Sequence, residues 1–386
     1  MRLAVYTDYV YRQVGDTIQA DRAFALFVAE LAPKTERLRL IGRLAPGDGE
    51  SRYELPPGIE LAALPHYGSL ADPRAALSSL GRSLRRAWRA LDDIDVVWVL
   101  GPFPHAVLLA FVALFRRRTI VLGIRQDWPR YVRMRRPGRR WMHWSADLLE
   151  WIWRSLARRL PVVAVGPELS ANYRRAPAVL DLVVSLVPAA ELERAPRARE
   201  YDAGLYVLSV GRLDQEKNPL LLADVLAVLH RHDHRWRLRV CGEGDLAEAL
   251  GDRLAELGLA DHAELLGYVP IGEDLYELYR SSHAFLHVSW TEGFPQVLVE
   301  AFACGLPVVA TDVGGVRAGV GSAALLVGPG DPHAAAGALE RIARDGDLRA
   351  RLTGDGRDRA SGLTLEAQIE RLAAFLATAD RRRREA

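Results

Sequence analysis

The sequence predicts an α/β protein with two domains, each built on a parallel β-sheet. The chain has 386 residues, and a single domain typically has roughly 100–200 residues. Short apolar runs alternate with longer amphipathic stretches, as strands buried on both faces alternate with helices in parallel sheets. This alternation stops between Pro188 and Gly204 and then restarts.

The first domain is predicted over residues 1–187. A helix is expected over Ile18–Leu31, because its apolar residues recur at helical spacing. Tyr9–Thr17, just before this helix, is expected to be a loop. The expected strands are the apolar runs Leu3–Tyr6, Leu38–Ile41, Ile59–Leu64, Val96–Leu100, Ile120–Ile124 and Val162–Val165.

Residues 188–204 carry two prolines and several charges without a clear period, which predicts a linker. Residues 205–360 are predicted to form the second domain. Residues 361–386 are expected to form a helix with a basic tail, a candidate to pack back on the first domain. The second domain's expected strands are Leu205–Val210, Leu238–Cys241, Leu265–Val269, Ala284–Val288 and Val308–Thr311, with helices at Pro219–Arg231 and Leu246–Leu257.

Composition limits the partners and the location. The net charge of +2 gives no argument for a nucleic-acid partner. Cys241 and Cys304 form no disulfide framework, which favours the cytoplasm, and no Cys/His spacing predicts a metal site. No leader precedes the first strand and no apolar run is long enough to span a bilayer, so a soluble or peripheral protein is expected.

Three loops of the second domain follow predicted strands and share a chemistry suited to phosphate and sugar. They run from Gly211 to Lys217, from Cys241 to Asp245 and from Ser289 to Glu300. Ligands of such sheets bind outside the carboxyl ends of the strands. Arg212 and Lys217 could neutralise a diphosphate, although both could instead pair with Asp214 or Glu216 in the same loop.

Local chemistry predicts where the helices near these loops begin. Asn218 is expected to cap a helix whose first residue is Pro219. A later helix is expected to begin at Pro295 and to end at Gly305. Glu292 then lies in a loop and Glu300 inside the helix. The helix N-terminus suits an anion, and the two carboxylates suit sugar hydroxyls.

The run Glu292–Gly315 (EGFPQVLVEAFACGLPVVATDVGG) resembles the Glu-x7-Glu motif of the retaining family 4 glycosyltransferases, the "group 1" transferases. Gly211-Arg212 with Lys217, Gly242 with Gly244, Gly267–Val269 and Leu325–Asp331 follow in the family's order and spacing. The resemblance covers Leu205–Arg344. It implies a GT-B fold, in which two Rossmann-like domains face a cleft, and an enzyme that needs no metal or other cofactor.

The resemblance also implies a role for each matched residue in binding a nucleotide sugar. Arg212 and Lys217 would stabilise the departing diphosphate, Glu292 would contact the donor sugar, and these three are the expected catalytic residues. Glu300 would bind the ribose, and Tyr268-Val269 would lie near the base. The other expected donor-binding residues are Gly211, Gly242, Gly244, Gly293, Phe294, Pro295, Gln296 and Val297.

The first half resembles the family poorly, and the resemblance does not identify the acceptor of the sugar. Gly15, Arg125 and Asp127 are candidates for the acceptor side, with a surface ion pair between Arg125 and Asp127 as the alternative. Two other functions stay open: a non-catalytic nucleotide-sugar-binding partner, and an epimerase or phosphorylase-like enzyme of the same fold. His283 and His287 are interpreted as core or sheet-end histidines.

Residues 128–159 hold nine arginines, five tryptophans and two acids. Trp141, Trp144, Leu148 and Trp151 recur at helical spacing. A basic, Trp-rich helix can lie on an anionic membrane surface, here the inner face. It could also be a lid over the acceptor cleft. We favour a third interpretation, a helix that packs tryptophan inward and arginine outward.

Overall fold

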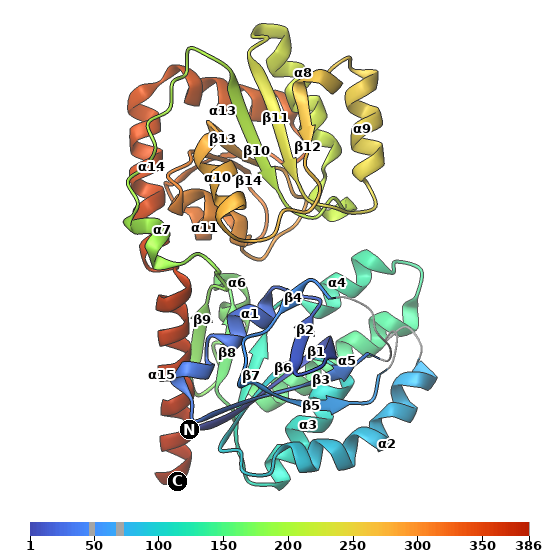
Figure 1. Cartoon of the computed structure of the whole chain (residues 1–386). Helices are drawn as coiled ribbons and strands as arrows, with labels where there is room; N and C mark the ends of the chain where they lie inside the picture. Colours follow the sequence, from blue (N-terminus) through green and yellow to red (C-terminus); the bar gives the residue numbers. More distant parts are fainter. Residues whose placement is uncertain (46–50, 67–72, 386) are drawn as a thin grey trace. The chain divides into compact units, whose positions relative to one another are not determined.

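The computed structural model describes residues 1–45, 51–66 and 73–385. They form two compact units (Figure 1). The first unit comprises Met1–Val184 and Gln368–Ala386, and the second comprises Ser185–Ala367. Each unit is an α/β structure built on a largely parallel sheet, which confirms the predicted fold class.

The first unit has a parallel sheet with the order β5-β3-β1-β6-β7-β8-β9. All six predicted strands are present. The bounds are β1 Arg2–Val14, β3 Arg37–Leu44, β5 Glu60–Leu64, β6 Val96–Gly101, β7 Thr119–Ile124, β8 Val162–Val165 and β9 Val179–Leu182. The helices are α1 Phe24–Ala29, α2 Pro73–Ala90, α3 Pro104–Phe115, α4 Trp128–Arg135, α5 Arg140–Ala157 and α6 Pro167–Asn172.

The predicted loop Tyr9–Thr17 and the start of the predicted helix Ile18–Leu31 are wrong. Strand β1 continues to Val14 and forms an antiparallel hairpin with β2 (Thr17–Ala20), which pairs in turn with β4 (Tyr53–Glu54). Residues Thr17–Ala20 alternate between half-buried and buried positions, a strand period that the longer apolar run concealed. The helix is therefore only the short α1.

The second unit has a fully parallel sheet with the order β12-β11-β10-β13-β14-β15. The strands are β10 Leu205–Val210, β11 Trp236–Cys241, β12 Ala263–Leu265, β13 Ala284–His287, β14 Val308–Thr311 and β15 Ala324–Val327. The predicted strand Leu265–Val269 is wrong, because the chain leaves the sheet after Leu265. The helices are α8 Leu220–His232, α9 Ala247–Glu256, α10 Glu273–Ser281, α11 Gln296–Ala303, α12 Val316–Val320, α13 Pro332–Arg344 and α14 Gly346–Ser361.

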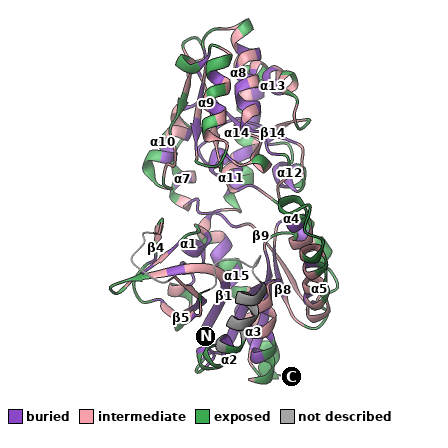
Figure 2. Ribbon diagram, turned by 90° about the vertical axis from the view of Figure 1, so that its right-hand side faces the viewer, coloured by how far each residue is buried: buried purple, intermediate pink, exposed green. Residues whose placement is uncertain are grey.

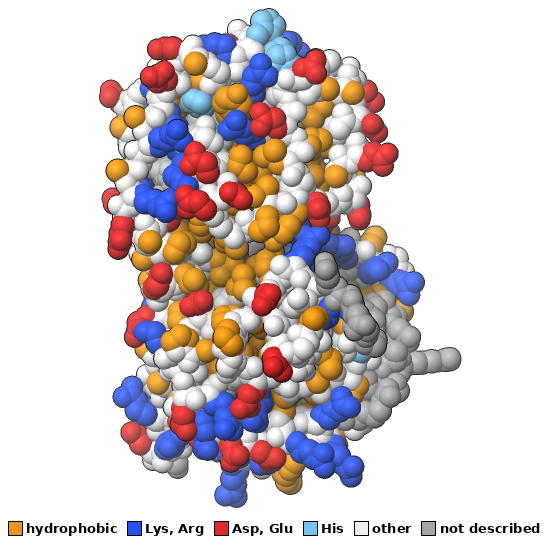
Figure 3. All heavy atoms as spheres, viewed as in Figure 1, with side chains coloured by type: hydrophobic (Ala, Val, Ile, Leu, Met, Phe, Trp, Pro, Cys, Tyr) orange, Lys and Arg blue, Asp and Glu red, His pale blue; other side chains and the backbone are white. Residues whose placement is uncertain are grey.

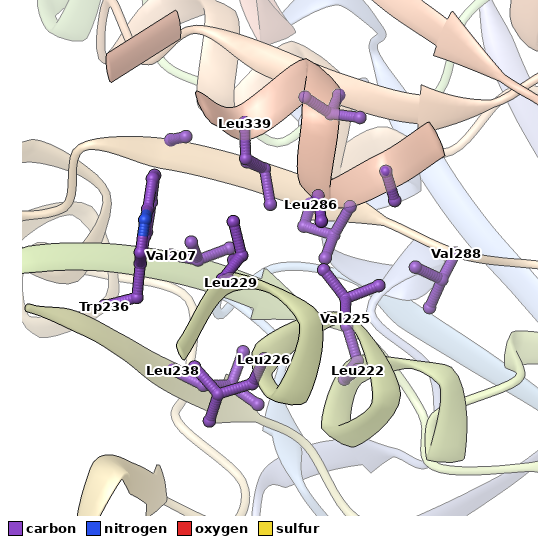
Figure 4. Packing of buried hydrophobic residues seen from close by; sticks show 14 of the residues in the cluster. Val207, Leu222, Val225, Leu226, Leu229, Trp236, Leu238, Leu286, Val288 and Leu339 are labelled. Atoms are coloured by element: carbon purple, nitrogen blue, oxygen red, sulfur yellow. The ribbon is translucent and has the colours of Figure 1, made fainter. Parts of the chain in front are cut away.

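The core of the second unit lies between this sheet and helices α8 and α13 (Figure 4). Leu222, Val225, Leu226 and Leu229 form the inner stripe of α8 at helical spacing. They pack against the continuous apolar strands, so one face of the sheet is filled by side chains. In contrast to this apolar face, the carboxyl edge of the sheet is formed by polar loops.

The segment predicted as a linker, residues 188–204, is counted within the second unit. It contains α7 (Ala189–Glu193), in which Glu191 is buried and accepts hydrogen bonds from Arg280 at 2.9 and 3.0 Å. The charges that suggested a solvated linker therefore fasten this segment to α10. At the other end, α15 (Leu365–Glu385) joins the first unit from Gln368 onward, where Thr119 donates to Asp380 at 2.9 Å.

Candidate functional site

Three loops meet at the carboxyl edge of the second sheet because their strands, β11, β10 and β13, are neighbours. Their backbones are joined directly. Leu213 N donates to Glu243 O at 2.8 Å, and Trp290 N donates to Glu216 O at 2.9 Å. This edge is where a doubly wound sheet binds its ligands.

Gly242 and Gly244 let two of these loops touch. A Cβ atom on Gly242 would lie 1.8 Å from Gly211 O, and one on Gly244 would lie 2.6 Å from Leu213 O. Neither position tolerates a side chain, so packing alone accounts for both glycines. A Cβ on Gly211 or Gly293 would meet no atom within 4 Å, so packing does not account for those two.

The structure brings Lys217 and Glu292 together, although they are far apart in the sequence. Lys217 Nζ donates to Glu292 Oε1. Ser289 Oγ donates to the same oxygen at 2.8 Å, and His287 Nε2 lies 3.1 Å from it. Glu292 Oε2 has no hydrogen bond to any described residue, so the carboxylate is held by one oxygen and presents the other.

Glu292 stays ionised although it is almost completely buried. Burial by itself would raise its pKa, but the hydrogen bond from His287 and the charge of Lys217 outweigh that effect and lower the pKa to about 2. The carboxylate is thus a fixed negative charge over the whole physiological range.

Arg212 pairs with Asp214 and Glu216, the partners that the alternative interpretation named. Lys217 does not follow that alternative, because its ion pair is with Glu292. The Arg212 side chain is 45% exposed. An exposed pair contributes about 0–1 kcal/mol, so the guanidinium could turn toward a ligand at little cost.

Glu300 lies apart from this cluster. It is buried in α11 and accepts a hydrogen bond from Tyr279 Oη at 2.7 Å, while Oε1 bonds to no described residue. Burial raises its pKa, and the bond from Tyr279 only partly offsets that effect. The two acids of the motif therefore have opposite electrostatic environments.

Helix α11 begins at Gln296, one residue later than predicted, with Pro295 as N-cap. No side chain among the described residues caps this end, which leaves the first-turn N–H groups of Gln296 and Val297 pointing out of the helix. Phe294 packs onto Gly319, where a Cβ would lie 2.2 Å from its ring. The helix ends at Gly305 (φ +63°) as predicted.

Two further predictions concern neighbouring turns. Asn218 is not a side-chain cap: it adopts a left-handed conformation (φ +52°), and Pro219 takes the N-cap position of α8. Tyr268 and Val269 are half-buried in the turn after β12, beside Gly267, whose carbonyl accepts from Gly242 N at 2.7 Å.

Sequence reasoning missed His287 and Ser289. His287 was interpreted as a sheet-end histidine, yet its Nε2 lies beside Glu292 and Ser289. The signal was its place at the last position of β13, where the sheet turns polar. His283 is a satisfied core histidine as predicted, since Tyr206 N donates to its Nδ1 and Nε2 donates to Glu200 O, both at 3.0 Å.

The acceptor-side candidates lie in the first unit. Gly15 occupies the β1–β2 turn with a φ of +58°. Arg125 and Asp127 do not form the suggested ion pair. Asp127 caps α4 by accepting from Arg130 N at 3.0 Å, whereas the Arg125 guanidinium stacks 3.9 Å over Phe24. Burial lowers the pKa of Arg125 to about 10.

Residues 128–159 form two helices, α4 and α5. The favoured interpretation of this segment is wrong for most of its tryptophans: Trp153 is fully buried, but Trp144 and Trp151 are 69% and 66% exposed. No helix in the described ranges has the length and hydropathy needed to cross a bilayer. Within the same ranges, no cluster of histidine, cysteine and acidic side chains is arranged to hold a metal.

Comparison with solved structures defines the class of fold. HepE from Anabaena, solved in complex with UDP and with UDP-glucose, has a TM-score of 0.70 to this chain for its UDP complex at 18% identity, covering 98% of this chain and all of that one. Sucrose-phosphate synthase from Thermosynechococcus elongatus has a TM-score of 0.74 at 19% identity, covering 98% of each chain. The chain has the GT-B fold.

Sequence comparison adds the family. Residues 193–359 match the family "Glycosyl transferases group 1", and this region belongs to it. The D-inositol 3-phosphate glycosyltransferase of Frankia alni is 38% identical over 170 residues, which cover 41% of this chain and 42% of that protein. That of Saccharomonospora viridis is 32% identical over 246 residues, covering 56% and 57%. The matched part spans about half the length of these relatives.

Proposed function

We propose that the protein is a retaining glycosyltransferase, which moves a sugar from a nucleoside diphosphate sugar to an acceptor hydroxyl without a metal or other cofactor. The observation that carries this proposal is the convergence of Lys217, His287 and Ser289 on one oxygen of Glu292. A cation and an oriented carboxylate then lie side by side, suited to a phosphate and to the sugar attached to it.

Donor binding would redistribute these contacts. A diphosphate competes with Glu292 for Lys217, and Arg212 can leave its exposed ion pairs to contribute a second cation. Glu292 Oε2 accepts from a sugar hydroxyl, and the N–H groups of Gln296 and Val297 face the phosphate. Glu300 Oε1 accepts from a ribose hydroxyl, and the turn at Tyr268-Val269 receives the base.

The chemical step follows from charge. Breaking the bond between the anomeric carbon and the diphosphate oxygen leaves negative charge on the diphosphate and positive charge on the sugar ring. Once donor binding has redistributed these contacts, Lys217, Arg212 and the helix N–H groups would surround the diphosphate and stabilise the leaving group, with little further reorganisation in the chemical step. The ionised Glu292 lies on the sugar side, where it stabilises the developing positive charge.

We propose that the acceptor carries an anionic group. The relatives are named for inositol 3-phosphate, and the half-buried cation Arg125 suits such an acceptor. We propose a cytoplasmic location, which the two buried, unpaired cysteines Cys241 and Cys304 support.

Release of UDP from UDP-glucose tests the proposal, because HepE was solved with that donor. The wild-type protein is expected to hydrolyse or transfer the donor with retention at the anomeric carbon, detected by NMR of the product. Glu292→Gln, which keeps the shape and removes the charge, is expected to lose this activity.

A thermal-shift series separates the enzyme from a binding partner. A ligand at a hundred times its dissociation constant stabilises the folded protein by about 2.7 kcal/mol. Stabilisation by nucleotide sugars without release of nucleotide would identify a non-catalytic partner. No shift with uridine, guanosine or adenosine diphosphate sugars would contradict the donor site itself.

A further inference from the structure

One side of the first unit carries an unusual concentration of exposed apolar side chains. Of the fourteen exposed large hydrophobic residues in the described part of the chain, ten lie on helices α2 to α5. Helix α2 packs against α3, α3 against α5, and α5 against α4. Helices α2 and α3 lie side by side in Figure 1, and α4 lies beside α5 in Figure 2. These ten residues are Leu84, Trp88, Phe111, Leu114, Phe115, Met134, Trp141, Trp144, Leu148 and Trp151; we call them the aromatic face.

Helix α5 shows that this exposure is built into the sequence. Its buried residues, Ala146, Trp153 and Ala157, form one stripe. At about 100° per residue, Trp144 and Trp151 fall on the opposite side of the helix. The helix therefore has two apolar stripes, one that packs in the core of the first unit and one that is exposed. A large apolar patch on a soluble surface usually marks an interaction site.

The charged residues around the aromatic face indicate what kind of partner binds it. All nine arginines of residues 128–159 are exposed, and the two acids of the segment, Asp147 and Glu150, are paired with Arg133 and Arg154 at 2.7 and 2.6 Å. Three more arginines, Arg116 to Arg118, directly follow the exposed end of α3. By contrast, acidic and basic side chains are mixed over the part of the second unit in view in Figure 3.

A second copy of the chain is a poor occupant for this surface. In a two-fold contact the same patch faces itself, so the arginine arrays of two copies would repel each other. An anionic bilayer fits both the exposed tryptophans and the surrounding arginines, because tryptophan rings favour the level of the lipid headgroups and arginine binds anionic lipid.

We propose that the aromatic face and its arginines form a docking surface for the anionic surface of a lipid bilayer. The tryptophans of α5 lie among the headgroups, and the arginines at its edge bind their phosphates. The proposal rests on the exposed side chains alone and stands independently of the proposed glycosyl transfer.

Vesicle co-sedimentation of the full chain tests this. Binding is expected to phosphatidylcholine vesicles that contain about one-third phosphatidylglycerol, to fall steeply between low and high salt, and to be absent with pure phosphatidylcholine. Failure to bind the anionic vesicles at low salt would overturn the proposal. Binding that ignores lipid charge would overturn its electrostatic basis.

Two variants with matched controls locate the surface. Arg139→Gln/Arg140→Gln/Arg158→Gln is expected to weaken binding about a hundredfold, at about fivefold per arginine. Trp144→Ser/Trp151→Ser is expected to weaken it at least about tenfold. The controls change exposed residues of the second unit, Arg231→Gln/Arg341→Gln/Arg351→Gln and Leu265→Ser/Leu266→Ser.

The controls are expected to bind as the wild type does, and circular dichroism checks that each variant is folded. Equal losses in variants and controls would show that the aromatic face is not the docking surface. Sedimentation velocity without lipid tests whether a second copy of the chain binds the aromatic face instead. If the wild type is a dimer and Trp144→Ser/Trp151→Ser dissociates it, the face serves self-association and the membrane proposal is overturned.

Discussion

The carboxyl edges of the two sheets treat buried charge differently. In the second unit, Lys217 pairs with Glu292, and Arg212 pairs with Asp214 and Glu216. In the first unit, Arg125 stacks on Phe24, and its buried Nε has no hydrogen-bond partner among the described residues. At the edge of the second sheet each cation thus has an acidic partner without a ligand, and we call this edge balanced in that sense. The edge of the first sheet is unbalanced, because within the described ranges it holds a cation without an acidic partner at a cost in stability. An unbalanced cation is informative, because a ligand can supply the missing charge.

The largest expected effect is on the balanced edge. Lys217→Ala should lower turnover with a nucleotide sugar by at least about a hundredfold, since in the proposed mechanism it removes a fixed charge that stabilises the leaving diphosphate. Lys34 is a matched control: it is the chain's other lysine and forms an exposed ion pair with Glu370 at 2.5 Å. Steady-state kinetics should show normal turnover for Lys34→Ala. Comparable rates in the two variants would remove Lys217 from the mechanism.

On the unbalanced edge, activity and stability should move in opposite directions. Arg125→Met keeps the apolar contact with Phe24 and removes a half-buried charge, so the free energy of unfolding should stay equal or rise. If Arg125 binds an anionic group of the acceptor, transfer should fall by about tenfold or more. Urea unfolding and transfer assays measure the two quantities. A variant that is less stable but fully active would make Arg125 a structural residue.

How far the sequence predicts the molecule also differs between the two edges. In the second unit, the two ends of α11 were predictable to within one residue because Pro295 and Gly305 act through local backbone geometry, which short spacings reveal. The hairpin around Gly15 was not predictable in this way, because the continuation of β1 past the sheet edge depends on Tyr11 packing over Gly42, a residue far away in the sequence. The contact is close: a Cβ on Gly42 would lie 2.3 Å from the Tyr11 ring.

Long-range pairing explains the remaining differences in the site. The sequence named Lys217 and Glu292 but could not show that they touch, and it gave His287 no role, because that role depends on Glu292 folding back toward its own strand. The exposure of Trp144 and Trp151 was equally hidden. A helical period shows that residues share a face, but only the packing of α5 against α3 shows which face turns inward.

The next largest effect tests whether His287 positions Glu292. His287→Ala removes one of three contacts to Glu292 Oε1, so kcat should fall by about tenfold. His283→Ala is the matched control, four residues earlier in the chain; it should lower stability through lost backbone bonds but leave kcat unchanged. The pKa of Glu292 should also rise in His287→Ala, since the bond from His287 helps to hold it down. An unchanged kcat would leave His287 a merely structural residue.

The smallest effect separates the two acids of the motif. The pKa of Glu292 is lowered from 4.5 to about 2, so its stabilising contribution is present above pH 4.5 and is lost as the pH falls toward 2. The pKa of Glu300 is raised above 4.5, so its charge destabilises the fold as the pH rises past that value. At pH 7, Glu300→Gln should therefore leave the free energy of unfolding equal or raise it, while Glu292→Gln should lower it. Urea unfolding of both variants at pH 7 and pH 5 measures this. A loss of stability in Glu300→Gln at pH 7 would mean that the buried carboxylate is better solvated than its contact with Tyr279 indicates.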